Sequence, residues 1–284
     1  NTDRTNTRTT TAGVTTGGAM PESNKTAFNP SIAARYELSD ALSLRAAAYK
    51  AFRAPGFNNT TRTFGSTTPT IANPNLGPEH LTGWELGADY RNDGFTLGAT
   101  YFNYRIQDMI ATFRVGSYAT APALVRSICS NGGANLTNCG GSANFYTNDQ
   151  DGESHGVELV AGWTLNRDLA LNASFTHTET YLTRRGSVVT DPLGVQLVAV
   201  PKNVAHLGAT WKPIERLRLY AEVRYIGPMM IDTTSTSGIR ARQGGSSVVN
   251  VSANYAWDAR TDLFINATNL FDREYSENAY TVTQ

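Results

Sequence analysis

The stretch that decides the fold is Leu217-Arg218-Leu219-Tyr220-Ala221-Glu222-Val223-Arg224-Tyr225. Apolar and polar residues alternate along it, and the two sets are Leu217, Leu219, Ala221, Val223 and Tyr225 against Arg218, Tyr220, Glu222 and Arg224. A β-strand places successive side chains on opposite faces of its sheet. Residues 217–225 therefore predict a strand with one apolar face and one charged face.

The same alternation recurs elsewhere in the chain. Its apolar positions are Trp84, Leu86, Ala88 and Tyr90; Leu169, Leu171, Ala173 and Phe175; and Val249, Val251, Ala253 and Tyr255. The pattern predicts ten strands, at residues 27–38, 42–52, 80–91, 95–113, 152–165, 169–181, 200–212, 217–228, 246–257 and 262–272. Residues 1–26 are expected to hold a loop and part of another strand. The chain is therefore predicted to be all-β.

The connections between these strands alternate between short turns and long loops. The turns centre on residues 39–40, 92–94, 166–168, 213–215 and 258–260. The long loops are residues 53–79, 114–151, 182–199 and 229–245. This order is typical of an antiparallel, up-and-down transmembrane β-barrel, in which all the long loops lie at one end. A soluble all-β protein remains the alternative.

Composition argues against two other classes of protein, those that span a membrane with helices and those that bind nucleic acid. No stretch approaches the ~18–20 continuous apolar residues of a membrane-spanning helix, and mean hydropathy is −0.33. The 24 basic and 24 acidic residues cancel, which gives no electrostatic case for binding nucleic acid. The first residues have no apolar signal-peptide core, so we expect a removed signal or an internal piece of a longer chain.

Charged residues within the strands are expected to line a hydrated barrel interior, because charges facing lipid are costly. These are Arg45, Glu85, Asp89, Arg91, Glu158, Arg218, Glu222 and Arg224. Aromatic residues gather near strand ends, as in the interfacial girdles of membrane barrels. They are Phe52, Tyr101, Tyr104, Trp163, Tyr181, Trp211, Tyr225, Trp257, Phe271 and Tyr275.

Two cysteines, Cys129 and Cys139, lie ten residues apart in a stretch rich in Gly, Asn and Ser. They can close a local disulfide, which suggests an oxidising compartment, and two free thiols are the alternative. A metal site is not expected there, because the loop holds no His or further Cys. The four histidines, His80, His155, His177 and His206, lack metal-ligand spacing. No catalytic motif is present, so an enzyme is not expected.

Several motifs carry a resemblance to a known family. They are Ala51-Phe52-Arg53-Ala54-Pro55-Gly56-Phe57, Asn73-Pro74-Asn75-Leu76-Gly77-Pro78-Glu79 followed by Trp84-Glu85-Leu86-Gly87, Tyr101-Phe102-Asn103-Tyr104-Arg105-Ile106-Gln107-Asp108-Met109-Ile110, and Asn266-Ala267-Thr268-Asn269-Leu270-Phe271-Asp272-Arg273-Glu274-Tyr275. In this order and at these spacings, residues 27–284 resemble the C-terminal part of a TonB-dependent receptor barrel. The last motif is similar to the Asn-Leu-Phe-Asp signature of the family's penultimate strand.

The resemblance implies a 22-stranded barrel with a plugged lumen. Counting back from the last motif assigns the ten strands to family strands 12 to 21. Residues 1–284 would then be one incomplete domain, without the plug, the TonB-binding segment, the first half of the barrel and the closing strand. Two open edges would expose unpaired backbone groups to lipid, so this piece is expected not to close alone.

The resemblance also implies that ligand arrives at the extracellular loops. Arginine and aromatic side chains there could grip an anionic, aromatic metal chelate. The candidates are Arg53, Phe57, Arg62, Arg114, Tyr118, Arg126, Arg184, Arg185, Arg240 and Arg242. Alternatively, these arginines solubilise exposed loops or bind lipopolysaccharide phosphates.

The function implied is TonB-dependent active import across the bacterial outer membrane, most often of a ferric siderophore. Cobalamin, haem or carbohydrate are alternative cargos, and a passive porin or a barrel adhesin is the alternative class. The expected partners are TonB, through the absent plug region, and outer-membrane lipid and lipopolysaccharide. A monomer without a covalently bound cofactor is expected, with the ferric chelate as transported ligand.

Overall fold

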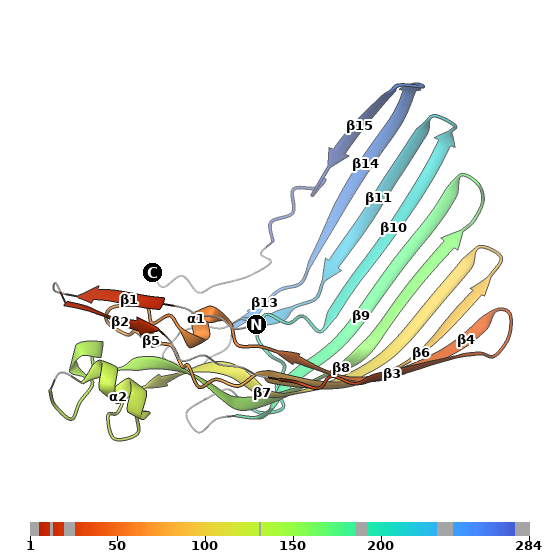
Figure 1. The fold of residues 1–284 in the computed structure, drawn as a ribbon. Coiled ribbons are helices and arrows are strands. Elements are labelled where there is room, and N and C mark those ends of the chain that lie inside the picture. Colours follow the sequence, from red (N-terminus) through yellow and green to blue (C-terminus); the bar gives the residue numbers. More distant parts are fainter. Residues whose placement is uncertain are drawn as a thin grey trace.

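The computed structural model describes residues 6–11, 14–19, 26–130, 132–185, 192–231 and 241–275. One antiparallel meander dominates it, in which each strand pairs with the next along the chain (Figure 1). Its strands are β3 (Ser31–Glu37), β4 (Leu42–Arg53), β6 (Glu79–Asn92), β7 (Phe95–Val115), β8 (Ala143–Thr164), β9 (Leu169–Arg184), β10 (Asn203–Ile214), β11 (Leu217–Ile226), β14 (Ser246–Asp258) and β15 (Thr261–Ala267). All ten predicted strands are present.

The remaining elements are short and lie in or near the loops. They are the hairpin β1 (Asn6–Thr11) and β2 (Val14–Ala19), strand β5 (Thr70–Ile71) parallel to β8, the pair β12 (Met229–Ile231) and β13 (Ala241–Gln243), helices α1 (Phe57–Thr60) and α2 (Ala123–Cys129), and the 3-10 helix η1 (Thr137–Cys139). No helix among the described residues has the length and apolar character needed to cross a membrane.

The strand register keeps one face of the sheet apolar from strand to strand. Leu44, Ala88, Ala99, Leu159 and Phe175 follow one another across five strands as direct cross-strand partners. A soluble sheet would cover such a face with a second layer. Here Trp84, Leu207 and Trp211 on this face remain 41%, 56% and 50% exposed. The apolar face is therefore the lipid-facing belt of a membrane barrel.

The opposite face is polar and hydrogen-bonded, as the alternation predicts. Arg45 Nε donates to Asp89 Oδ2 at 3.1 Å, and the hydroxyls of Tyr49 and Tyr104 both donate to Glu85 Oε1, at 2.7 and 2.8 Å. The prediction that Tyr104 belongs to an interfacial girdle is therefore wrong. Its hydroxyl points to the interior, where a carboxylate accepts it.

The short turns are encoded locally. In the β6–β7 turn, Asp93 and Gly94 have φ values of 38° and 83°, which is the left-handed backbone of a two-residue hairpin and suits an Asp-Gly pair. In the β8–β9 turn, Asn166 Oδ1 accepts the N–H groups of Asp168 and Leu169, each at 2.8 Å. These side-chain bonds satisfy backbone groups that would otherwise lack partners.

Several predicted boundaries are wrong: β3 begins at Ser31 and not at residue 27, β10 spans Asn203–Ile214 and not 200–212, and two differences are larger. Strands β7 and β8 continue to Val115 and from Ala143, so their loop is residues 116–142 and not 114–151. Beyond the lipid belt apolar and polar residues no longer alternate regularly, so alternation does not mark the strands there: Met109, Ile110 and Ala111 are consecutive in β7, and residues 147–151 of β8 are all polar. At the other end of the chain, β15 stops at Ala267, and the Asn-Leu-Phe-Asp motif forms a turn. There Asn269 Oδ1 accepts the Arg273 N–H at 2.9 Å and Asn269 Nδ2 donates to the Arg273 carbonyl at 3.0 Å.

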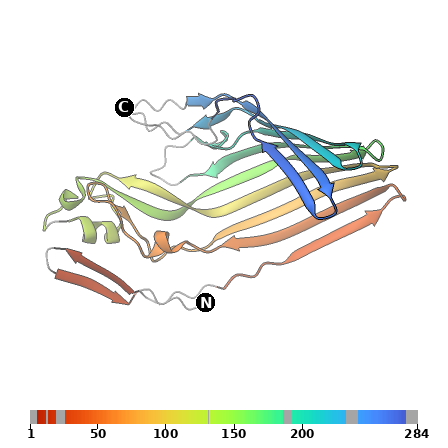
Figure 2. The ribbon, with the colours of Figure 1, turned by 90° about the horizontal axis from the view of Figure 1, so that it is seen from above.

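The sheet is curved and open (Figures 1 and 2). Strands β3 and β15 lie at the two ends of its order and do not pair with each other. Within the described residues it is thus a partial barrel wall. All the short turns lie along one margin, and the long loops with α1 and α2 lie along the other (Figure 1).

Candidate functional site at the loop-bearing end

The loop between β7 and β8 folds into a compact unit, which we call the loop knob (residues 116–130 and 132–142). It contains α2, η1 and the disulfide between Cys129 and Cys139. Its apolar side chains pack with β5 and with the adjoining ends of β7 and β8. The buried members are Ile71, Val115, Ala121, Val125, Cys129, Leu136, Cys139, Ala143 and Phe145. The pair of cysteines considered in the sequence is therefore joined, and it staples this small core.

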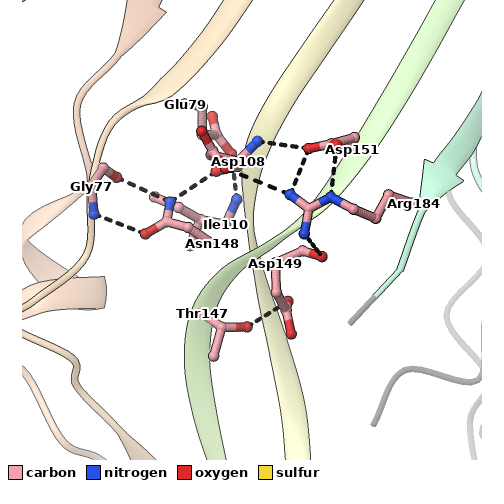
Figure 3. Close-up of polar contacts among 9 residues, drawn as sticks. All are labelled: Gly77, Glu79, Asp108, Ile110, Thr147, Asn148, Asp149, Asp151 and Arg184. Carbon is pink, nitrogen blue, oxygen red and sulfur yellow. Dashed lines mark hydrogen bonds and ion pairs between the residues drawn. The ribbon is translucent and has the colours of Figure 1, made fainter. Parts of the chain in front are cut away.

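A polar network connects the loop before β6 to β7, β8 and β9 (Figure 3). We call this network the mouth clasp, and its members are Gly77, Glu79, Asp108, Asn148, Asp151 and Arg184. Asn148 is its bridge. Its Nδ2 donates to the carbonyls of Gly77 and Asp108 at 3.0 and 2.8 Å, and its Oδ1 accepts the Gly77 N–H at 2.8 Å. One side chain thus satisfies three backbone groups from two segments that are distant in sequence.

Arg184 occupies the second half of the clasp. Its guanidinium makes a bidentate contact with Asp151, at 2.7 and 2.8 Å, and donates to the Asp149 carbonyl at 2.8 Å. Asp108 Oδ1 lies 3.5 Å from the same group. Paired N–H···O bonds of this kind are strong and directional. The Arg184 guanidinium holds the pKa of Asp151 below its ordinary value, and the Asp108 N–H, donating at 3.0 Å, adds to this effect.

Glu79 anchors the start of β6. It is 4% exposed, accepts the Ile110 N–H at 2.7 Å and pairs with the exposed guanidinium of Arg53. The hydrogen bond to Ile110 depends on an irregularity of β7, where the register with β8 shifts around Met109 and Asp108 has a φ of 57°. The shift turns the backbone N–H groups of Asp108 and Ile110 toward carboxylates of neighbouring strands.

The predicted ligand residues therefore fall into different surroundings. Arg53 and Arg184 are held by carboxylates of the clasp. Arg62 lies over the ring of Phe64 at 5.7 Å, and Arg126 over the ring of Tyr118 at 5.8 Å. The structure does not bring all of the candidates together.

The other candidates are spread over four segments. Arg114 donates to Ser142 Oγ at 3.1 Å, and Phe57 on α1 is 57% exposed. Arg242 on β13 stands opposite Met230. Arg185 is exposed directly after β9. Arg240 lies outside the described residues.

Sequence reasoning missed the carboxylates and the amide of the clasp. Asn148, Asp149 and Asp151 lie in β8, whereas the sequence pattern predicts a loop there. The Asn-Asp-Gln-Asp run of residues 148–151 carried a signal, since so many short polar side chains in one strand need backbone partners. In the described part of the chain, no cluster of three or more His, Cys, Asp or Glu side chains is arranged to hold a metal ion.

The comparison with known families rests on most of the chain. Residues 1–270 match the family model described as TonB dependent receptor-like, beta-barrel. The chain belongs to this TonB-dependent receptor family. The prediction from the motifs is confirmed, and so is the antiparallel barrel fold.

The individual relatives are distant. An iron-regulated outer membrane virulence protein of Vibrio cholerae is 23% identical over 259 residues, which is 89% of this chain and 37% of that protein. The ferric enterobactin receptor PirA of Pseudomonas aeruginosa is 23% identical over 265 residues, or 87% of this chain and 32% of that protein. The first is described as an outer membrane protein and the second as a receptor.

Among solved structures, the ferric yersiniabactin uptake receptor FyuA of Yersinia pestis shares the fold, with a TM-score of 0.67 and 19% identity over 97% of this chain and 37% of that one. The chain thus spans about a third of the length of the relatives it matches. It is part of an outer-membrane barrel of the TonB-dependent receptor type.

Proposed function

We propose that the chain forms part of an outer-membrane receptor for TonB-dependent import of a ferric siderophore. The observation that carries this proposal is the family match over residues 1–270, together with iron-related descriptions of the relatives. Residues 1–284 would be one incomplete barrel domain. TonB would act through a plug domain outside these residues, and the complete protein would work as a monomer.

At the loop-bearing end, the predicted ligand residues would have two different roles, which are ligand binding and loop support. The stacked pairs Arg62 with Phe64 and Arg126 with Tyr118 present a guanidinium beside an aromatic ring. An anionic chelate with aromatic groups can accept charge-assisted hydrogen bonds from the guanidinium and pack on the ring. Arg53 and Arg184 would instead hold the loops in place, because clasp carboxylates already engage them.

Deletion of the gene tests the cargo. Under iron limitation, the deletion strain should fail to grow on one or more ferric siderophores and grow normally on other iron sources. Loss of growth on haem or cobalamin, or of uptake of a carbohydrate, would replace the siderophore with that cargo. Unchanged growth on the whole panel, with slower passive entry of small solutes, would favour a porin instead.

Removing the stacked arginines tests the site. In the complete protein, Arg62→Ala combined with Arg126→Ala should weaken binding of the ferric chelate at least about tenfold, since hydrogen bonds to charged groups contribute ~1.5–3 kcal/mol each. Equilibrium binding of radiolabelled ferric chelate measures this. The control is Arg35→Ala, whose exposed pair with Glu37 lies near the short-turn margin. Equal affinities of the wild-type protein, the double variant and Arg35→Ala for the ferric chelate would contradict the assignment of Arg62 and Arg126 to the binding site.

A further inference from the structure

The core of the loop knob includes a residue from a different loop. That residue is Ile71, which lies in the loop before β6, here called the strap (residues 54–78). Ile71 is 0% exposed and belongs to the same core as Cys129, which is also 0% exposed. The other core members all lie within residues 115–145. The strap and the knob, which run side by side (Figure 2), therefore bury apolar surface in common.

Backbone bonds hold the strap to the start of β8 on both sides of this buried isoleucine. β5 pairs in parallel with β8, and the Asn144 N–H donates to the Pro69 carbonyl at 2.8 Å. Beyond β5, Asn73 Nδ2 donates to the Tyr146 carbonyl at 2.9 Å. The strap is thus fixed to the base of the knob by directional bonds as well as by its buried side chain.

A close approach at Gly140 fixes a further point of the strap. Gly140 follows η1 and has a φ of 58°. A Cβ atom there would lie 2.5 Å from the Thr67 carbonyl oxygen and 3.0 Å from the Thr67 methyl group. Glycine alone combines a left-handed backbone with such a contact at no steric cost. The backbone of the knob is therefore shaped to receive the strap.

The fixed part of the strap holds the first arginine–aromatic pair. Phe64, whose ring lies beside the Arg62 guanidinium, exchanges two backbone bonds with Thr70, at 3.1 and 2.7 Å. The Thr63 hydroxyl accepts the Ala72 N–H at 3.2 Å. The two neighbours of the buried isoleucine thus hold the segment that carries Arg62.

The second arginine–aromatic pair is attached to the same core through α2. Val125 and Cys129 of α2 are buried in this core, and the disulfide to Cys139 closes it. Arg126 follows Val125 in the helix and stacks on Tyr118, which itself packs against the core. One small core therefore supports both pairs, although the pairs belong to different loops.

We infer that this shared core fixes the two arginine–aromatic pairs relative to each other, with Ile71, Gly140 and the Cys129–Cys139 disulfide as its positioning groups. For its ligand, an anionic ferric chelate, the inference rests on the proposed function. A chelate that contacts both guanidinium groups binds more tightly when they are held in place beforehand, because less conformational freedom is lost on binding. A disulfide in one loop thereby controls the position of an arginine in another.

Hydrogen exchange of the complete protein in detergent tests the shared core without any ligand. Ile71→Ala leaves a cavity in the core and should speed exchange in α2 by about tenfold or more. Removing the disulfide, by Cys129→Ala with Cys139→Ala, should speed exchange of strap residues 64–73 to a similar extent. Leu182→Ala is the matched control, because Leu182 is 3% exposed but lies in β9 outside this core. It should change exchange in neither loop.

Unchanged exchange in the loop that does not carry the substitution would overturn the inference. The cysteine variant and the isoleucine variant probe the coupling from opposite sides, and coupling between two sites is reciprocal. Both variants should still assemble, since the knob and the strap lie outside the membrane, and heat-modifiable mobility verifies assembly.

Affinity for the ferric chelate then tests the positioning role. Ile71→Ala should weaken binding about tenfold, because a smaller fraction of the receptor has both pairs in place, and the uptake rate at saturating chelate should be unchanged. Ile71→Val keeps most of the side-chain volume and should restore binding. In the variant that lacks Arg62 and Arg126, Ile71→Ala should have little further effect, because the residues it positions are gone. An equal loss in both backgrounds would overturn the positioning role.

The exchange and binding measurements distinguish this inference from the proposed function. Coupled exchange in a wild-type protein that binds no ferric chelate would refute the proposed function alone. Chelate binding without coupled exchange would refute the shared core alone.

Discussion

At the scale of single residues, buried and partly buried carboxylates decide the role of the arginines around them. Glu79 is almost completely buried and is satisfied by the Ile110 N–H and by Arg53. Asp151 is satisfied by Arg184 and by the Asp108 N–H. A carboxylate out of water needs such partners, and removing one leaves a large part of its desolvation cost uncompensated. These two arginines therefore hold loops in position.

Replacing Glu79 with Gln should loosen the loop before β6. The amide keeps one acceptor for the Ile110 N–H, but it loses the charge that holds Arg53, at a cost of about 1–3 kcal/mol. Hydrogen exchange of residues 70–80 in the complete protein should become faster. Glu37→Gln is the control, because the Glu37 side chain is 64% exposed, whereas that of Glu79 is 5% exposed, and fully exposed ion pairs contribute little. Equal acceleration in both variants would contradict this reading of Glu79.

The Asp151–Arg184 pair predicts a pH dependence. Asp151 lies six residues beyond Val157, the last belt residue of β8, which is roughly 20 Å along the strand and outside the membrane. Its pKa is lowered in the folded protein by Arg184, so its contribution to stability is fully present above the unfolded pKa of about 4. This contribution to stability is lost as the pH falls through the lowered pKa of Asp151 in the folded protein.

Hydrogen exchange of the Asp108 N–H, corrected for the intrinsic pH dependence of exchange, measures how often the bond from this N–H to Asp151 opens. Protection should persist from neutral pH down to about pH 4 and fall only on further acidification. In Arg184→Ala, the pKa of Asp151 should rise and protection should be lost at a higher pH. If the two proteins lost protection at the same pH, the clasp would not depend on this pair.

At the scale of elements, the long strands β7, β8 and β9 each have a belt segment and an extension. The belt segment alternates apolar and polar residues, and its apolar side chains face lipid. The extension lies beyond the membrane, where β7 and β8 bend at the irregularity near Met109 and carry the clasp and the loop knob. The belt segments therefore determine insertion, and the extensions determine the shape of the mouth.

A pair of neighbouring residues tests the orientation of the belt segments. Val251 lies in the middle of the apolar positions of β14 and Ser252 lies on the opposite face. Val251→Arg should cost ~2–4 kcal/mol, because it places a charge near the bilayer midplane, and Ser252→Arg should be tolerated. The amount of heat-modifiable receptor in outer-membrane fractions measures assembly. A stronger defect in Ser252→Arg would reverse the assigned faces.

At the scale of the whole molecule, the sheet formed by the described residues has two unpaired edges. Every residue of β3 is exposed, and β15 is exposed along most of its length. Unpaired backbone groups are not tolerated in hydrocarbon, so these edges must pair with further strands. The sheet can serve as a barrel wall only together with those strands.

Expression of these 284 residues alone should therefore give no closed barrel. We expect aggregation or a species that unfolds without a heat-dependent shift in gel mobility, since the two edges remain unpaired. The complete protein is the control and should show the shift. A stable, closed, detergent-soluble monomer formed from residues 1–284 would contradict this expectation.

Sequence by itself determined the ten strands, the two faces of the sheet, the short turns and the family, because each depends on residue order within a few positions. Period-two alternation assigns a face to each residue, and Asp-Gly or Asn side chains specify turns locally. Tertiary structure alone decided the contacts of the arginines and the packing of the loop knob. Arg53, Arg105 and Arg184 look alike in sequence. They differ in the structure because carboxylates from other strands, brought close by the register and by the β7 irregularity, determine what each guanidinium contacts.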